Sequence, residues 1–157
     1  MKDSEVRQFD GSKGEVASCR FAVVVSQYHE TITSKLLDGA LSTLAQVGVP
    51  DANIVIAHVP GSWELAVTAR RLLDQVEAVI CLGVVIKGET THDQYINSML
   101  GNTLGQLSVE YVKPVSFGVL TCNTMEQAVE RSGGKVGNKG EEAASAAIQL
   151  LQLFQQF

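Results

Sequence analysis

The feature that most constrains this chain is an apolar run that ends in a polar turn and a histidine, at residues 79–92 (VICLGVVIKGETTH). Four to eight apolar residues bounded by glycine are typical of a buried parallel strand. In an open α/β sheet, ligands bind beyond the carboxyl ends of such strands. The run therefore predicts that His92 lies at the ligand-binding edge of a sheet, on the first turn of the next helix. There a histidine can exchange protons near neutral pH, and the helix start can bind an anion.

Strand-like and helix-like segments alternate along the rest of the chain. Apolar, β-branched runs predict strands at residues 20–26, 53–59, 78–84 and 114–121. Helical spacing of apolar residues predicts helices at 31–47, from 63 onward, at 92–111, near 124–131 and at 141–154. We therefore expect an α/β fold: a three-layer sandwich with a four-stranded parallel sheet, flavodoxin-like in outline. Residues 1–157 should form a single domain, with residues 1–19 as an extended N-terminal arm or tail.

Composition and charge exclude several classes of protein. A chain of 157 residues can bury one substantial core, and its net charge of −5 disfavours an extended nucleic-acid surface. Three cysteines, Cys19, Cys81 and Cys122, show neither a CxxC pair nor metal-ligand spacing. We expect no metal site, no membrane span and no signal segment, and hence a cytoplasmic protein.

Polar and aromatic residues follow the predicted strands where their carboxyl ends should meet. Tyr28 follows the first strand, and an aromatic ring at such an edge can stack on a planar heterocycle. Ser62 is placed to cap the helix that begins at Trp63, and Glu64 could accept hydrogen bonds from polyol hydroxyls. The backbone N–H groups at the end of the third strand could bind the edge of a pyrimidine-like ring. These groups belong to Val84, Val85 and Ile86.

Two cations are candidate partners for an anionic group. Arg131 opens a Gly-rich turn and offers a planar fork, and Lys139 within the turn offers a point charge. Each candidate also has a plainer interpretation. His92 could be a helix-start cap, Arg131 an ordinary helix-end cation, and Trp63 a structural residue that contacts ligand only through its backbone. Their shared position at one sheet edge favours a site.

Several nucleotide-binding motifs are missing. The segment SGGKVGNKG does not match GxxxxGK[ST], and no GxGxxG follows the first strand. Gly83 occupies the place where a receiver domain would carry its phosphoacceptor aspartate. These mismatches argue against a P-loop protein, a dinucleotide-binding domain and a response regulator.

Six segments in the same order give the chain a resemblance to the lumazine synthase family, whose members catalyse the penultimate step of riboflavin biosynthesis. The segments are ITSKLLDGA (32–40), VPGSWELA (59–66), LGVVIKGETTHDQY (82–95), FGVLT (117–121), EQAVERSG (126–133) and GNKGEEAA (137–144). Together they cover about residues 21–151. The GETTH turn and the segment from ER to GNKG are the most specific of them.

The resemblance implies a role for each candidate residue. It implies that Tyr28 stacks on the pyrimidine ring and that His92 transfers protons. It implies that Glu89 and Thr90 bind the phosphate of the second substrate, with Arg131 as its charged partner. It implies that Ser62, Trp63 and Glu64 hold the ribityl chain of the first substrate, and that the backbone of Val84, Val85 and Ile86 contacts its uracil ring. It also implies that the adjacent subunit contributes three residues to the site: Phe117, Arg131 and Lys139.

The reaction implied by the resemblance condenses 5-amino-6-(D-ribitylamino)uracil with 3,4-dihydroxy-2-butanone 4-phosphate. Its products are 6,7-dimethyl-8-ribityllumazine, phosphate and water, and it needs no cofactor or metal. The family forms homo-pentamers, and some members assemble twelve pentamers into a hollow icosahedral shell. The short turn at residues 133–140 has no insertion, which is similar to the 60-subunit members.

Three other interpretations compete with this one. An archaeal-type riboflavin synthase shares the fold and would dismutate two lumazine molecules. A flavin- or lumazine-binding shell protein would have lost turnover, although this chain keeps His92, Arg131 and Lys139. A general flavodoxin-like binding module is disfavoured because no phosphate loop follows the first strand.

Overall fold

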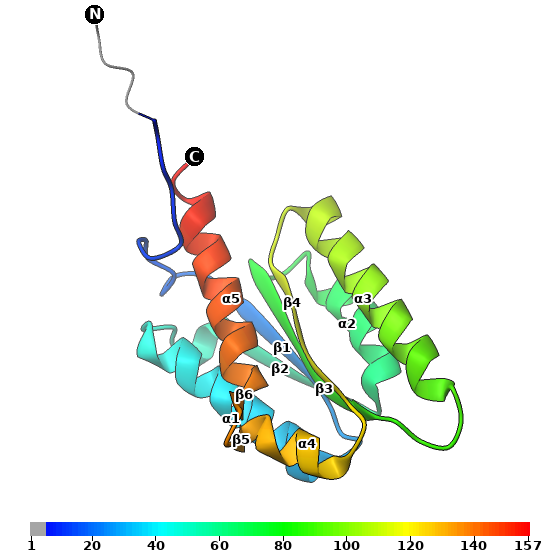
Figure 1. The fold of residues 1–157 in the computed structure, drawn as a ribbon. Coiled ribbons are helices and arrows are strands. Elements are labelled where there is room, and N and C mark those ends of the chain that lie inside the picture. Colours follow the sequence, from blue (N-terminus) through cyan, green and yellow to red (C-terminus); the bar gives the residue numbers. More distant parts are fainter. Residues whose placement is uncertain (1–5) are drawn as a thin grey trace, which may run out of the picture.

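A parallel four-stranded sheet with helices on both faces forms the centre of the molecule, as the computed structural model of residues 6–157 shows (Figure 1). The strand order is β2-β1-β3-β4, so both edges of the sheet are open. Helices α1 and α5 cover one face, and α2 and α3 cover the other (Figure 1). The predicted α/β three-layer architecture is confirmed. The elements are β1 (Phe21–Ser26), α1 (Glu30–Gln46), β2 (Ile54–Val59), α2 (Leu65–Leu72), β3 (Ala78–Ile86), α3 (His92–Tyr111), β4 (Val115–Cys122), α4 (Met125–Glu130), β5 (Ser132–Gly134), β6 (Gly137–Asn138) and α5 (Lys139–Phe154), with short 3-10 turns at Asp51–Asn53 and Ser62–Glu64.

The central strand β3 is apolar throughout because both of its faces are buried. Ile80 and Leu82 pack in the core under α1 and α5, whereas Val79 and Cys81 pack in the core under α2 and α3. Continuous apolar runs of this kind are what a parallel strand covered on both sides requires. The two half-cores fix the sheet between the helical layers, and its carboxyl ends are left to form a rim.

Helices α1 and α5 pack closely through a glycine. A methyl group added at Gly140 would overlap the carbonyl oxygen of Leu36 in α1. Next to it, the Asn138 Oδ1 accepts the N–H of Gly140 at 2.8 Å and caps α5. The Nδ2 group of Asn138 donates to the carbonyl of Lys35 at 3.0 Å. The β5–β6 hairpin is therefore held firmly against α1 where it leads into α5.

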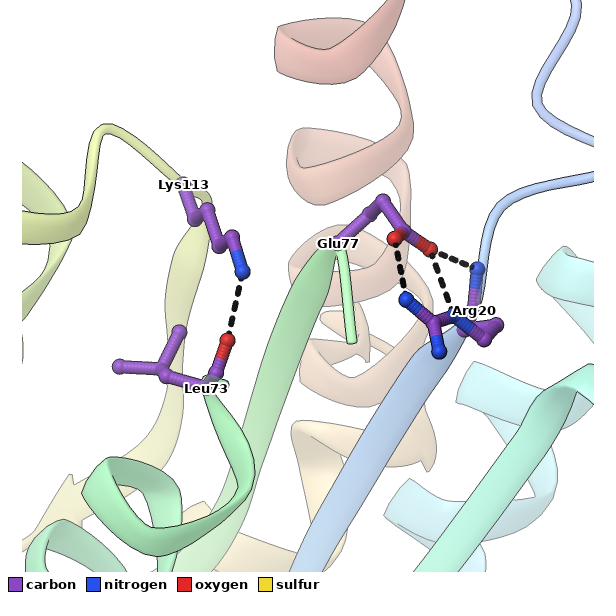
Figure 2. Close-up of polar contacts among 4 residues, drawn as sticks. All are labelled: Arg20, Leu73, Glu77 and Lys113. Atoms are coloured by element: carbon purple, nitrogen blue, oxygen red, sulfur yellow. Dashed lines mark hydrogen bonds and ion pairs between the residues drawn. The ribbon is translucent and has the colours of Figure 1, made fainter. Parts of the chain in front are cut away.

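Polar contacts connect the amino ends of the strands, at the opposite end of the sheet from His92 (Figure 2). The Arg20 guanidinium lies 2.9 Å from the Glu77 carboxylate, and the Arg20 backbone N–H donates to the other carboxylate oxygen at 2.5 Å. Lys113 donates to the carbonyl of Leu73 at 2.6 Å. Mainly because of the hydrogen bond from the Arg20 side chain, the pKa of Glu77 is lowered. The first contact connects the starts of β1 and β3, and the second connects the start of β4 to the end of α2.

Part of the predicted N-terminal arm lies along α5 (Figure 1). Side chains from the last turns of α5 donate to backbone carbonyls of the arm: Gln152 to Gly14 at 3.1 Å and Gln155 to Glu15 at 2.8 Å. Residues 1–5 of the predicted arm lie outside the described residues. From residue 6 onward, no helix combines the length and hydropathy needed to cross a bilayer.

Candidate functional site

A pocket of about 830 Å³ opens at the carboxyl ends of β1 and β3, between the 3-10 turn before α2 and the start of α3. Its volume is within the range of small-molecule sites. Nine predicted site residues line it: Tyr28, Ser62, Trp63, Glu64, Val84, Val85, Ile86, Thr90 and His92. The remaining lining residues are His29, Gly61, Gly88, Asp93, Tyr95 and Ile96.

Four predicted site residues do not line the pocket of their own chain: Glu89, Phe117, Arg131 and Lys139. Glu89 is exposed in the turn between Gly88 and Thr90, which both line it. Phe117 lies on the edge strand β4 and is 39% exposed. A single chain thus brings together the groups expected to hold the heterocycle and its side chain, and leaves two cations and an aromatic ring outside.

Strand β3 extends past its neighbour β1, and this offset forms the wall of the pocket. The β1–β3 pairing ends at Val25–Leu82, whereas β3 continues beside β4 as far as Ile86. Lys87 donates its N–H to the carbonyl of Cys122 in β4. Because backbone direction alternates along a strand, Val84 and Ile86 direct their N–H and C=O groups to the other side, where β1 has ended. A flat ring with donors and acceptors on its edge can bind there.

The prediction that Ser62 caps a helix beginning at Trp63 was wrong, because Ser62 is itself the first residue of a 3-10 turn, Ser62–Glu64. Gly61 is the N-cap, and the Glu64 Oε2 accepts the N–H of Gly61 at 3.0 Å. Ser62 lies inside the first turn, so its hydroxyl cannot reach back to cap it. The carboxylate of Glu64 is fixed at the pocket wall, and the Trp63 side chain is 53% exposed.

Tyr28 stands at the mouth of the pocket on a tight reversal after β1. Its backbone N–H donates to the carbonyl of Pro60 at 3.1 Å, and the N–H of Gln27 donates to Val59 at 2.8 Å. The next residue, His29, has a left-handed backbone (φ 60°), and its ring meets that of Tyr28 edge-on at 4.5 Å. Since the Tyr28 side chain is 67% exposed, it can stack on a bound ring.

The first turn of α3 presents His92 at the rim. Thr91 is the N-cap and makes no side-chain capping bond, so N–H groups at the helix start remain available to an anion. Tyr95 and Ile96 follow at helical spacing and line the same pocket, and so does Asp93. The prediction from sequence missed these three residues. For Tyr95 and Ile96 the signal was present, because positions three and four after a helical residue share its face.

The two predicted cations lie near each other at the two ends of the β5–β6 hairpin, Arg131 just before β5 and Lys139 just after β6. The backbone N–H of Lys139 donates to the carbonyl of Arg131 at 2.9 Å. The Arg131 guanidinium donates to the carbonyl of Gln127 at 3.1 Å, and the Lys139 ammonium pairs with Glu142 at 2.8 Å. Arg131 also lies near the end of β4: burial raises the pKa of the Cys122 thiol, and the positive charge of Arg131 opposes that shift.

The buried thiol of Cys81 is a core group. Burial raises its pKa to about 12, so it is protonated at neutral pH and is no nucleophile. From residue 6 to the end of the chain, no three His, Cys, Asp or Glu side chains gather as a metal site would require.

Two hydroxyls, one lining the pocket and one behind it, are buried without a hydrogen-bond partner in the described part of the chain. They belong to Ser26, which is 1% exposed, and Ser62, which is 7% exposed. An unpaired buried polar group of this kind costs about 1–3 kcal/mol. Ser26 was not predicted as a site residue, because nothing in the sequence distinguishes it from an ordinary strand-end serine.

Comparisons with known proteins agree on one family. A family model described as 6,7-dimethyl-8-ribityllumazine synthase matches residues 18–155. Proteins of that name from Rhodopirellula baltica and Thermus thermophilus are 44% and 45% identical to the chain. The first alignment covers 92% of this chain and 94% of the relative, and the second covers 87% and 88%. One from Aquifex aeolicus is 43% identical, with 86% and 89% covered.

Proposed function

The chain belongs to the 6,7-dimethyl-8-ribityllumazine synthase family, and we propose that the pocket containing His92 is where its two substrates react. The protein is an enzyme of riboflavin biosynthesis. It condenses 5-amino-6-(D-ribitylamino)uracil with 3,4-dihydroxy-2-butanone 4-phosphate to give 6,7-dimethyl-8-ribityllumazine, phosphate and water. This assignment is favoured over a riboflavin synthase and over a non-catalytic binding protein.

One observation supports the proposed site: an aromatic ring, a carboxylate and free backbone groups, all needed to bind the first substrate, face one pocket. Tyr28 offers an aromatic face, and Glu64 offers a fixed carboxylate. Val84 and Ile86 offer backbone donors and acceptors beyond the end of β1. In the proposed complex, Tyr28 stacks on the uracil ring, the β3 backbone pairs with its edge, and the turn Ser62–Glu64 holds the ribityl hydroxyls.

We propose that His92 moves protons during the condensation. The amine of the first substrate attacks the ketone of the second, water leaves to give an imine, phosphate leaves, and the ring closes with loss of a second water. Each stage needs a proton moved to or from nitrogen or oxygen near neutral pH, which imidazole does well. Most of the acceleration should come from holding the two substrates together.

The phosphate should bind where two subunits meet. Glu89 and Thr90 lie in the turn before α3, whose uncapped helix start favours an anion. Arg131, Lys139 and Phe117 do not line the pocket of their own chain. We propose that they complete the pocket of the adjacent subunit in a homo-pentamer.

Surface features support such an assembly. Val55 and Ile56 are 47% and 40% exposed on the open edge strand β2, and Val67 and Val109 are 68% and 78% exposed on α2 and α3. Exposed apolar groups and an unpaired sheet edge are typical of surfaces that another chain covers. Because the β5–β6 turn is short, we further propose the 60-subunit shell. Sedimentation that finds only a species of about five subunits would remove the shell and keep the pentamer.

We also propose that residues 1–157 act as one cytoplasmic domain. The activity is tested by mixing both substrates with the protein and following the fluorescence of the lumazine product. Incubation with lumazine alone is the control, since a riboflavin synthase would then form riboflavin and this enzyme should not. No product from the two substrates in a folded, assembled protein would contradict the assignment.

The shared site is tested by mixing subunits. His92→Ala and Arg131→Ala each impair every site of a uniform oligomer. When the two variants are unfolded together and reassembled at random, about a quarter of the interfaces should combine an intact His92 with an intact Arg131. Activity should rise above that of either variant alone. If both residues act within one chain, mixing should restore nothing.

A further inference from the structure

Two serine hydroxyls lie below the pocket, at the ends of elements that are distant in the sequence. Ser26 ends β1 and is 1% exposed, and Ser62 begins the 3-10 turn and is 7% exposed. Neither oxygen has a hydrogen-bond partner within residues 6–157. Ser62 lines the pocket, whereas Ser26 lies behind it. Buried hydroxyls are normally paired, so these two require an explanation.

Both hydroxyls point at the same place, the missing side chain of Gly83. A Cβ built on Gly83 would lie 2.7 Å from the Ser62 Oγ and 3.3 Å from the Ser26 Oγ, with Leu65 at 3.1 Å. Gly83 is on β3, one position beyond the last β1–β3 pair, Val25–Leu82. The sheet therefore brings two unpaired hydroxyls together over a residue that has no side chain.

The chemistry of this group of three residues favours a neutral hydroxyl as its ligand. Each serine offers one donor and two acceptor lone pairs, as a sugar alcohol does. A phosphate would need a cation; within residues 6–157 no Lys or Arg of the same chain lines this pocket, and the proposed phosphate position is the turn before α3. An apolar group would leave both hydroxyls unpaired, at a cost in free energy. A polyol hydroxyl can form a hydrogen bond with Ser62 from the pocket side. The Ser26 hydroxyl can then form a second hydrogen bond with Ser62 from behind.

We propose that Ser26 is a positioning residue for the polyol chain of the first substrate. The two hydroxyls are not hydrogen-bonded to each other in this structure. When substrate binds, the Ser26 hydroxyl donates to the Ser62 Oγ and directs the Ser62 hydroxyl toward the ribityl group, and the missing side chain of Gly83 leaves room for this approach. This inference rests on the proposed function, because it needs a substrate with a ribityl chain in this pocket. Ser26 acts through Ser62 and does not touch the reacting atoms.

The test compares two unreactive ligands that differ only in the polyol. One is a 5-nitrouracil with a 6-ribitylamino chain, and the other is the same ring with a 6-pentylamino chain. Their inhibition constants are measured against lumazine formation by the wild-type enzyme, Ser26→Ala, Ser62→Ala and the double variant. Ser116→Ala, a strand serine next to Ile80 in register, is the matched control. Thermal unfolding of each variant is recorded alongside.

Ser26→Ala should weaken the ribityl inhibitor about fivefold, the loss expected for one neutral hydrogen bond, and should leave the pentyl inhibitor unchanged. The double variant should bind the ribityl inhibitor no worse than Ser62→Ala, because the two residues act as one unit. Gly83→Ala should mimic these losses by pushing the Ser62 hydroxyl aside.

Equal weakening of both inhibitors by Ser26→Ala, or no weakening of either, would overturn the inference. Losses of Ser26→Ala and Ser62→Ala that simply add would also overturn it, since Ser26 would then not act through Ser62. Failure of the proposed function looks different: the wild-type protein itself would form no lumazine from the two substrates.

Discussion

The backbone N–H of Lys139 donates to the carbonyl oxygen of Arg131 at 2.9 Å, so the two cations proposed to serve the phosphate start side by side at the base of the β5–β6 hairpin. Their side chains are held differently. The Arg131 guanidinium is tied to the backbone of Gln127, whereas the Lys139 ammonium pairs with Glu142, whose side chain is 59% exposed. Arg131 is thus fixed before substrate binds, while Lys139 must exchange a carboxylate for the phosphate.

Arg131→Ala should raise the KM for the phosphate-bearing substrate about ten- to a hundredfold, the worth of a hydrogen bond to a charged group. The KM for the ribitylaminouracil should change little. Arg131→Lys should recover only part of the loss, because an ammonium lacks the planar fork. Lys135→Ala, at the exposed tip of the same hairpin, controls for a general loss of charge. An unchanged KM for the phosphate-bearing substrate in Arg131→Ala would refute this role.

His92→Ala should slow turnover without abolishing it. Proton transfer by a positioned side chain contributes about 10²–10⁴-fold, and the positioning of two substrates in one pocket survives the substitution. The kcat of lumazine formation should fall within that range, while substrate affinities change much less. Complete loss of activity in a variant that still folds and assembles would mean that the histidine does more than move protons.

The four strands of the sheet were predictable because each is a short run rich in apolar and β-branched residues. β3 is apolar on both faces, and this pattern predicted a buried parallel strand, whereas its place in the order β2-β1-β3-β4 was not predicted. Its end was predicted two residues short, at Val84 instead of Ile86, because pairing with β4 extends it. The turn at Ser62 was predicted as a capped helix start, and the Glu64–Gly61 bond that replaces the cap is a local contact that composition does not reveal.

Residues that line the pocket were predictable only where they lie at or after the carboxyl end of a strand. Tyr28, Glu64 and His92 follow strands, and a parallel sheet brings such residues to one edge. Ser26 could not be found in this way, since its importance depends on facing the Cα of Gly83 across the sheet. In the proposed assembly Phe117 and Arg131 act in the pocket of a second chain, which a pattern within one chain does not position.

The ion pair at the amino end of the sheet gives a prediction about pH. The hydrogen bond from Arg20, ahead of all other causes, holds the pKa of Glu77 below its ordinary value of 4.5. A carboxyl with a lowered pKa stabilises the fold above its unfolded pKa and loses that contribution as pH falls through its folded pKa. Glu77→Gln should therefore be slightly less stable than wild type at neutral pH, with the difference vanishing on acidification.

The effect should be small, because the Arg20 and Glu77 side chains are 57% and 37% exposed and water screens the pair. Urea unfolding at pH 7 and at about pH 3 measures the difference between wild type and variant at each pH, which cancels the other carboxyls. Asp74→Asn is the matched control, because it likewise removes one carboxylate from an exposed ion pair, the one with Arg70. If the difference in unfolding free energy between wild type and Glu77→Gln were larger at about pH 3 than at pH 7, the ion pair with Arg20 would not have the expected stabilising role.

Gly140, the one glycine of α5, should not tolerate a side chain, because the helix touches α1 there without any side chain between them. A methyl group at this position would overlap the carbonyl of Leu36, and a backbone atom cannot turn aside as a flexible side chain can. Gly140→Ala should cost about 3 kcal/mol or more of the free energy of unfolding, measured by urea denaturation. Gly101→Ala in α3 is the matched control, since within residues 6–157 its added methyl meets no atom within 4 Å beyond its chain neighbours and the adjacent backbone of its own helix. As helix propensity favours alanine, the control should unfold no earlier than wild type.

Similar stability of the two variants would show that α1 and α5 can separate enough to admit a side chain. It would also show that the hairpin between Arg131 and Lys139 is held less firmly than the contact at Gly140 implies.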